Sequence, residues 1–228
     1  MFTGVYDLTM GQSTTTPTGG TTLSDIVGIV IEGQTYRNVL YLFLAFPLGL
    51  IYYFVLVLGF TLGLVLSVLV VGLGILLGTA IGLRYIAAFE RGLANTLLGT
   101  EIPEPDDVKK ADGGIVETGK AYLQAPSTWR GLAFVVLKFP LGILAFILLV
   151  SFLGTGLELL LIPLFPEGVF NVQIAGWEVA RSVETTTHQA IAVLVGAVLT
   201  LAAFHILNVV AGAYASIASS LLGSGSAE

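Results

Sequence analysis

The chain has 228 residues, of which 55% are hydrophobic and 11% charged, and its formal net charge is −6. Soluble domains carry about 25% charged residues, so this composition excludes an ordinary soluble protein and indicates lipid as the solvent. The absence of cysteine excludes disulfides and cysteine metal sites, and the acidic balance argues against a nucleic-acid partner.

Residues 1–35 are predicted to form a disordered tail. The stretch from Gln12 to Thr22 consists largely of Thr, Gly and Pro, and it offers no apolar surface that could be buried. A basic segment is missing at the start and Asp7 is present, so we do not expect a signal peptide.

A first pair of membrane spans is predicted between Arg37 and Arg84. The 46 residues between them include no charge, whereas one helix needs about 20 apolar residues to cross the hydrocarbon core. We therefore expect two spans, Val39–Phe60 and Leu62–Gly82, with a turn near Gly59–Gly63. A single tilted helix would be about twice the necessary length.

Glycines line one face of the second span. Gly74, Gly78 and Gly82 are spaced four residues apart, and small residues at this spacing allow helix backbones to approach closely. We expect this face to pack inside the bundle, with an interface between protomers as the alternative.

The second span is predicted to continue as a short amphipathic helix in the cytoplasm. Apolar residues recur at helical spacing as far as Leu97, and Gly99 is a suitable stop. Glu90 and Arg91 lie within this extension. They either form a solvated face or contact the other half of the chain or a partner.

A polar connector, residues 101–128, leads to a second pair of spans at Gly131–Leu153 and Ala190–Val210. Lys138 is the charge deepest within a span. A buried charge in a span is a functional candidate, but Lys138 could also snorkel to the interface or make a structural contact. His205 in the fourth span could titrate near neutrality or simply pack.

The connector 154–188 between the third and fourth spans is predicted to face outward. It carries several acidic residues, including Glu158, and an alternating stretch at Phe170–Ile174 that fits a small hairpin or an interfacial helix. Most Lys and Arg residues lie on the opposite side, which predicts a multi-pass cell-membrane protein with both termini in the cytoplasm.

The two halves resemble each other in sequence. Residues 36–49 realign with residues 129–142 at an offset of 93, with six of 14 positions identical. Residues 83–100 realign with residues 207–224 at an offset of 124. The sequence thus predicts two tandem two-helix repeats, at 36–100 and 129–224, each ending in a helical extension. The 31 additional residues of the second repeat fall in its outer connector.

Pro47 and Pro140 are matched by the first offset. Each removes a backbone donor part-way along a span, so we expect a bend at both positions. The bend could act as a hinge, or it could be a fixed feature of helix packing.

No motif in the sequence predicts catalysis. We find no nucleophile elbow, Walker motif, dinucleotide fingerprint or zinc protease signature. We expect no enzyme activity, no cofactor and no metal site.

The sequence resembles the Putative sensor domain family, which occurs ahead of some prokaryotic histidine kinases and as separate archaeal proteins. The features that carry the resemblance are the Pro-Leu-Gly of the first span, Phe89–Arg91, Leu97–Gly99 and Thr128–Arg130. The resemblance implies an all-α domain with four transmembrane helices and a role in signal input. It also implies a protein partner that carries the signal onward, because no kinase region is found.

Two other functions remain open. The chain could be a small transporter or channel, with Lys138, His205 and Asn208 as the polar candidates along a path. It could also be a structural subunit of a membrane complex, or form a homo-oligomer.

Overall fold

The computed structural model describes residues 28–107, 115–165, 173–174, 177–178 and 185–224. In this part of the chain, four helices are long and apolar enough to span a membrane, so the prediction of an all-α protein with four transmembrane helices is confirmed. Most of the predicted N-terminal tail lies outside the described residues.

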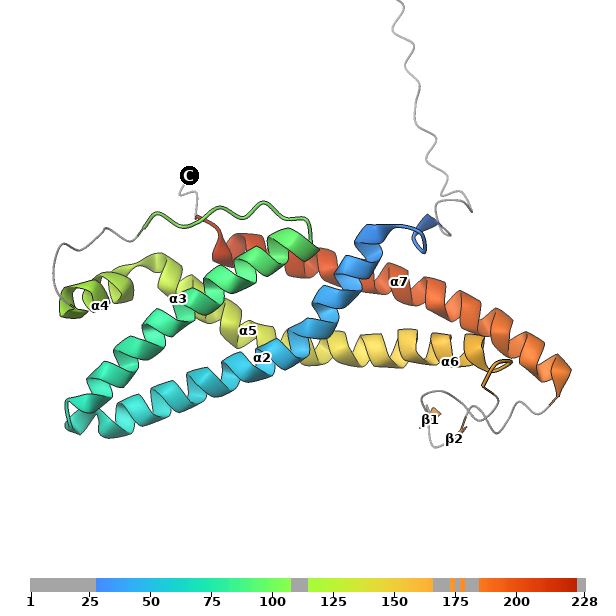
Figure 1. The fold of residues 1–228 in the computed structure, drawn as a ribbon, viewed down its shortest axis with the longest axis horizontal. Coiled ribbons are helices and arrows are strands. Elements are labelled where there is room, and N and C mark those ends of the chain that lie inside the picture. Colours follow the sequence, from blue (N-terminus) through green and yellow to red (C-terminus); the bar gives the residue numbers. More distant parts are fainter. Residues whose placement is uncertain (1–27, 108–114, 166–172, 175–176, 179–184, 225–228) are drawn as a thin grey trace, which may run out of the picture.

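The first hairpin consists of α2 (Gly33–Val65) and α3 (Val71–Leu97), joined through a 3₁₀ segment at Leu66–Val68 (Figure 1). The predicted turn near Gly59–Gly63 is wrong, because α2 continues through both glycines. Both glycines serve close packing within the hairpin. A Cβ atom added at Gly63, for example, would lie 2.6 Å from the side chain of Leu76 in α3.

The second hairpin has a less regular first arm. It begins as α5 (Pro126–Leu148), continues through a π-helical segment at Leu149–Gly154, and ends as α6 (Thr155–Leu161). Its second arm is α7 (Thr186–Leu222), a single uninterrupted helix of 37 residues. Before the π segment the arm packs against both α2 and α7, and after it α6 packs against α7.

Two small elements lie outside the spans. Helix α4 (Ile115–Gln124) occupies part of the predicted polar connector and was not anticipated. Strands β1 (Gln173–Ile174) and β2 (Trp177–Glu178) pair antiparallel in the connector between the third and fourth spans, in favour of the hairpin over the interfacial helix.

The tips of the two hairpins lie on one side of the molecule, and the start of α2 and the end of α7 lie on the other. Figure 1 shows the α2–α3 turn and the β1–β2 pair along one side, and the start of α2 and the end of α7 along the other. The four spans are 27 to 37 residues long, more than the roughly 20 needed to cross the hydrocarbon core, so they must tilt or extend beyond it.

Helices α2 and α5 cross at two glycines. A Cβ atom added at Gly49 would lie 3.1 Å from the carbonyl oxygen of Lys138, and one added at Gly142 would lie 2.6 Å from the carbonyl oxygen of Ala45. The two contacts are equivalent in the two halves of the chain, because the offset of 93 residues matches Gly49 to Gly142 and Ala45 to Lys138. Because lipid gives no hydrophobic drive for helix association, such close backbone approach supplies much of the packing.

Aromatic stacks flank this crossing in the same pattern. The rings of Phe46 and Phe146 stack with centroids 4.9 Å apart, and those of Tyr53 and Phe139 stack at 4.8 Å. The offset of 93 converts one pair into the other, because 46 + 93 = 139 and 53 + 93 = 146.

Each hairpin is also closed by a pair of glycines. A Cβ atom at Gly72 would meet the carbonyl oxygen of Gly63, and one at Gly196 would lie 2.9 Å from that of Gly156. Gly63 and Gly156 differ by 93 residues, and Gly72 and Gly196 by 124. The 31 additional residues therefore lie beyond the matched glycine contact of the second hairpin.

Candidate functional site: a buried charge pair where four helices meet

Lys138 and Glu90 form an ion pair in the interior of the bundle. The Nζ atom of Lys138 in α5 lies 2.6 Å from Oε2 of Glu90 in α3, and both side chains are fully buried. The pair joins the two hairpins, because each partner comes from a different one. At this distance the contact is a charge-assisted hydrogen bond, which is stronger than one between neutral groups.

Tyr41 of α2 bridges the two charges. Its hydroxyl accepts a hydrogen bond from Lys138 Nζ at 3.1 Å and donates one to Glu90 Oε2 at 3.4 Å. Its ring also lies beneath the ammonium group, 4.3 Å from Nζ to the centroid. A desolvated cation over an aromatic face gains about 2 kcal/mol, which helps to offset the loss of hydration.

Helix α7 completes the site with Tyr214. Its ring packs edge-on against Tyr41 with centroids 5.6 Å apart, and lies 6.0 Å from Lys138 Nζ. Each long helix thus contributes at least one side chain. A charge pair placed here is sensitive to any relative movement of the four helices.

Some buried oxygen atoms of the site have no hydrogen-bond partner. Among the described residues, Oε1 of Glu90 and the hydroxyl of Tyr214 are buried and lack a hydrogen-bond partner. The hydroxyl of Tyr52 lies within reach of the Glu90 carboxylate. Buried polar atoms usually find partners, so Oε1 of Glu90 and the hydroxyl of Tyr214 have unused hydrogen-bonding capacity.

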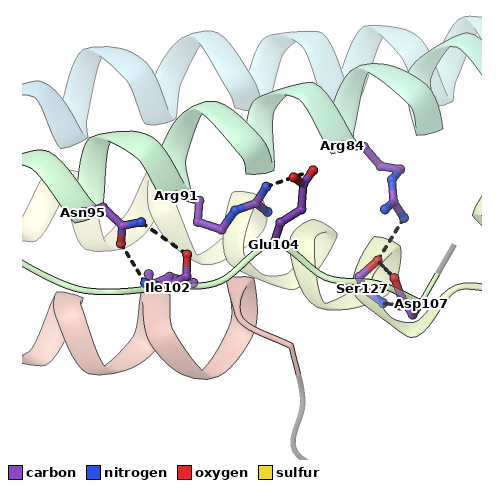
Figure 2. Close-up of polar contacts among 7 residues, drawn as sticks. All are labelled: Arg84, Arg91, Asn95, Ile102, Glu104, Asp107 and Ser127. Carbon is purple, nitrogen blue, oxygen red and sulfur yellow. Dashed lines mark hydrogen bonds and ion pairs between the residues drawn. The ribbon is translucent and has the colours of Figure 1, made fainter.

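A second polar region lies where residues 101–107, which we call the strap, run along α3 (Figure 2). The side chain of Asn95 accepts from the backbone N–H of Ile102 at 2.9 Å and donates to its carbonyl at 3.2 Å. Further along, Asp107 accepts from the backbone N–H and the hydroxyl of Ser127, both at 2.7 Å. The strap is therefore fixed to α3 at one end and to the start of α5 at the other.

The strap's Asp107 is held in its charged form. Partial burial would raise the pKa of this carboxyl, but the two hydrogen bonds from Ser127 and the positive charge of Arg84 outweigh it and lower the pKa below the ordinary value of 3.8. The anchor is thus complete at neutral pH.

The two halves of the chain make matching hydrogen bonds to threonine hydroxyls. Arg84 of α3 donates to the hydroxyl of Thr128 at 3.0 Å, and Asn208 of α7 donates to that of Thr35 at 3.0 Å. The residues correspond, because 84 + 124 = 208 and 35 + 93 = 128. The contact is the same in both halves, but only one of the two donors is charged.

The sequence model of the family described as Putative sensor matches residues 41–222. The chain belongs to this family. The match runs from Tyr41 in α2 to the end of α7, so it includes every residue of the buried site. No curated protein and no solved structure matches the chain.

In this member of the Putative sensor family, Lys138 does not snorkel to the interface. It makes the structural contact that was the alternative, and Glu90 lies opposite it instead of on a solvated face. The neighbouring Arg91 points away from the pair, towards Glu104 of the strap (Figure 2). His205 is exposed on α7 and is not part of the buried site.

The glycine face of the second span does not pack as predicted. Cβ atoms added at Gly74, Gly78 or Gly82 would have no neighbour within 4 Å among the described residues, so this face does not pack against that part of the chain. Spacing alone identifies a smooth helix face, but it does not say which way the face points.

Two further predictions can be compared with the structure. Glu158 was expected in an exposed outer connector, but it lies in α6 and is 1% exposed, because the helix continues past Leu153. Pro47 and Pro140 both lie inside continuous helices. The hinge and the fixed bend both stay predictions.

Sequence reasoning missed Tyr41, Tyr52 and Tyr214 as site residues. A helical projection places Tyr41 and Ala45 on one face of α2, and the offset of 93 equates Ala45 with Lys138. That equivalence was a usable signal for the site.

Proposed function

We propose that this chain is a membrane sensor module that passes a change in its four-helix bundle to a separate protein. The observation that carries the proposal is the buried Lys138–Glu90 pair, which links the two hairpins at 2.6 Å. A stimulus that weakens or strengthens this contact alters the packing of α3 against α5. Since α3 and α7 continue to Leu97 and Leu222, their ends can transmit that change.

Matched contacts support the further proposal that the two hairpins are repeats related by a pseudo-two-fold axis. The glycine crossing, the aromatic stacks and the threonine contacts all exchange under the two sequence offsets. An axis along the membrane normal suits hairpins that enter the membrane in the same sense. In this arrangement, a stimulus could rock one hairpin against the other about the glycine crossing.

We further propose that the strap and the ends of α3 and α7 are cytoplasmic, as the distribution of Lys and Arg predicts. The chain has no cysteine, so single cysteines can be introduced without background. In intact cells, cysteine at Thr96 should resist a membrane-impermeant maleimide, whereas cysteine at Leu69, in the α2–α3 turn, should react. The reverse pattern would refute the orientation.

The sensor proposal is tested by crosslinking in native membranes, with an affinity tag after Glu228. We expect a signalling protein to be recovered, and Lys138→Met to change its yield. His205→Gln is the control, because this exposed histidine lies outside the buried site. Recovery of a stoichiometric complex with a non-signalling enzyme alone would contradict the proposal.

Transport is the second candidate, favoured by the unpartnered oxygen atoms around Glu90. Water bound there could connect Glu90, Tyr52 and Tyr214 in a polar path. Proton or ion flux into proteoliposomes that is lost in Lys138→Leu would support transport over sensing.

A further inference from the structure

A cavity of about 410 Å³ lies beside the strap, outside the buried site. It lies between α3, the strap, α4, the start of α5 and the end of α7, and it is partly open to its surroundings. Its walls include two arginines, two tyrosines and two leucines, namely Arg84, Arg91, Tyr85, Tyr122, Leu221 and Leu222.

Arg84 is held in place but retains free donors. One guanidinium nitrogen donates to the hydroxyls of Ser127 and Thr128, at 2.9 and 3.0 Å. The group also lies over the ring of Tyr122, 5.0 Å from the centroid. A guanidinium has five N–H donors, so about three remain for an acceptor in the cavity.

Arg91 is paired only loosely. Its guanidinium lies 3.6 Å from a carboxylate oxygen of Glu104, and the side chains are 13% and 83% exposed, respectively. An ion pair of this length, open to solvent on one side, contributes little. A better acceptor can therefore take the place of Glu104.

The acidic residues of the cavity all come from the strap. Glu104 and Asp106 line it from between the anchors at Ile102 and Asp107, and Figure 2 shows Glu104 reaching across to Arg91. The segment between the anchors can shift outward while both anchors hold. Glu104 then leaves Arg91, which α3 keeps fixed.

The cationic wall is particular to this half of the chain. The residues matched to Arg84 and Arg91 at the offset of 124 are Asn208 and Ala215. Since the second half makes the corresponding threonine contact with a neutral donor, the positive charge of Arg84 is not required for that contact.

We propose that this cavity binds a phosphate-bearing ligand, and that Glu104 is a built-in competitor for it. Guanidinium groups bind phosphate through paired hydrogen bonds, and the tyrosines and leucines can receive an apolar portion of the ligand. Tyr85 is 74% exposed beside the cavity, as expected of an aromatic side chain at a membrane interface. The ligand can thus be a lipid headgroup or a soluble phosphate. The proposal does not depend on the sensor function.

The test uses the full-length protein with Pro103→Cys on the strap, labelled with an environment-sensitive dye. One arm adds pyrophosphate to protein in phosphatidylcholine nanodiscs. The other compares these nanodiscs with nanodiscs that contain increasing phosphatidylglycerol. A saturable change in the first arm identifies a soluble phosphate, and one in the second arm alone identifies a lipid headgroup.

Three variants decide whether the response comes from this cavity. Arg91→Gln should weaken binding by about tenfold or more, as expected for a charged hydrogen bond. Glu104→Gln should tighten it about two- to fivefold, as expected for the loss of a surface ion pair. Arg37→Gln removes the same charge from an exposed position outside the cavity, and should change nothing.

The proposal is overturned by no response in either arm, by unchanged binding in Glu104→Gln, or by equal losses in Arg37→Gln and Arg91→Gln. The last result would mean that the probe follows net charge. The ion-pair partner of Arg91 is an exposed side chain, and glutamine retains part of the buried stem of Arg91 together with a hydrogen-bonding head group. We therefore expect the replacement to leave the fold intact and the readout interpretable.

Discussion

The two hairpins share their packing contacts and differ in their charges. Each contributes a glycine to the central crossing, two rings to the aromatic stacks beside it, and a threonine whose hydroxyl accepts a hydrogen bond from the other hairpin. At four matched positions, one half carries a charged residue and the other an uncharged one. The matched pairs are Ala45/Lys138, Glu90/Tyr214, Arg84/Asn208 and Arg91/Ala215. The shared positions build the bundle, and the charged ones form the buried pair and the cavity.

The largest effect is expected from breaking the buried pair. Lys138→Met or Glu90→Gln alone leaves a buried charge or its polar partners unsatisfied, which should cost about 3–5 kcal/mol. The combined Lys138→Met/Glu90→Gln variant should recover most of this loss. Thermal unfolding in one detergent measures all three.

Arg91→Gln is the matched control for this cycle. Arg91 adjoins Glu90 in sequence but contacts an exposed carboxylate, so the change should stay within about 1 kcal/mol. A combined variant that loses the sum of the two single losses would show that the charges are not coupled.

Next in size are the glycines of the crossing. Gly142→Ala places a methyl group 2.6 Å from the backbone of Ala45, which should cost about 1–3 kcal/mol. Gly49→Ala, with 3.1 Å to the backbone of Lys138, should cost less. Gly78→Ala has open space and should be neutral or stabilising, because alanine favours helix.

These three variants, ranked by unfolding midpoint, distinguish the packing glycines from the stripe glycines. Equal losses at Gly142 and Gly78 would mean that the stripe also packs against protein, for example in a homo-oligomer.

The smallest effect concerns the strap anchor at Asp107. Because its pKa is lowered in the folded protein, the anchor stabilises the strap above the unfolded pKa and is lost as the pH falls through the folded pKa, below 3.8. A spin label at Pro103→Cys should therefore become more mobile only at such acidic pH, with about 0.5–1 kcal/mol at stake, as for a helix cap.

With Asp107→Ala, this label should be mobile at every pH. Asp106→Ala, which removes an exposed carboxylate next to the anchor, should keep the wild-type profile. A profile that is unchanged in Asp107→Ala would mean that Asn95 alone holds the strap.

Much of the fold could be predicted from the sequence, because the uncharged stretches have the length of membrane spans. The turn of the first hairpin could not, since Gly59 and Gly63 suit a turn and a close helix contact equally well. Gly99, predicted as a helix stop, has the expected positive φ of 67°.

The candidate site was predictable only in part. Lys138 stood out as a charge within a span, and Glu90 as a charge beyond one. That they meet depends on how far α3 and α5 slide past each other, which no local pattern specifies. The direction of the Gly74–Gly82 stripe and the burial of Glu158 depend on the same tertiary placement.

The most direct test of the account measures whether the buried pair controls the ends of α3 and α7. Thr96 in α3 and Ser220 in α7 are exposed and matched at the offset of 124. Spin labels on cysteines at both positions, in nanodiscs, should give one narrow distance distribution in the wild-type background. In Lys138→Met, the account predicts a shifted or broadened distribution, with the Lys138→Met/Glu90→Gln variant closer to wild type. An unchanged distribution in folded Lys138→Met would contradict the claim that this pair couples the two halves.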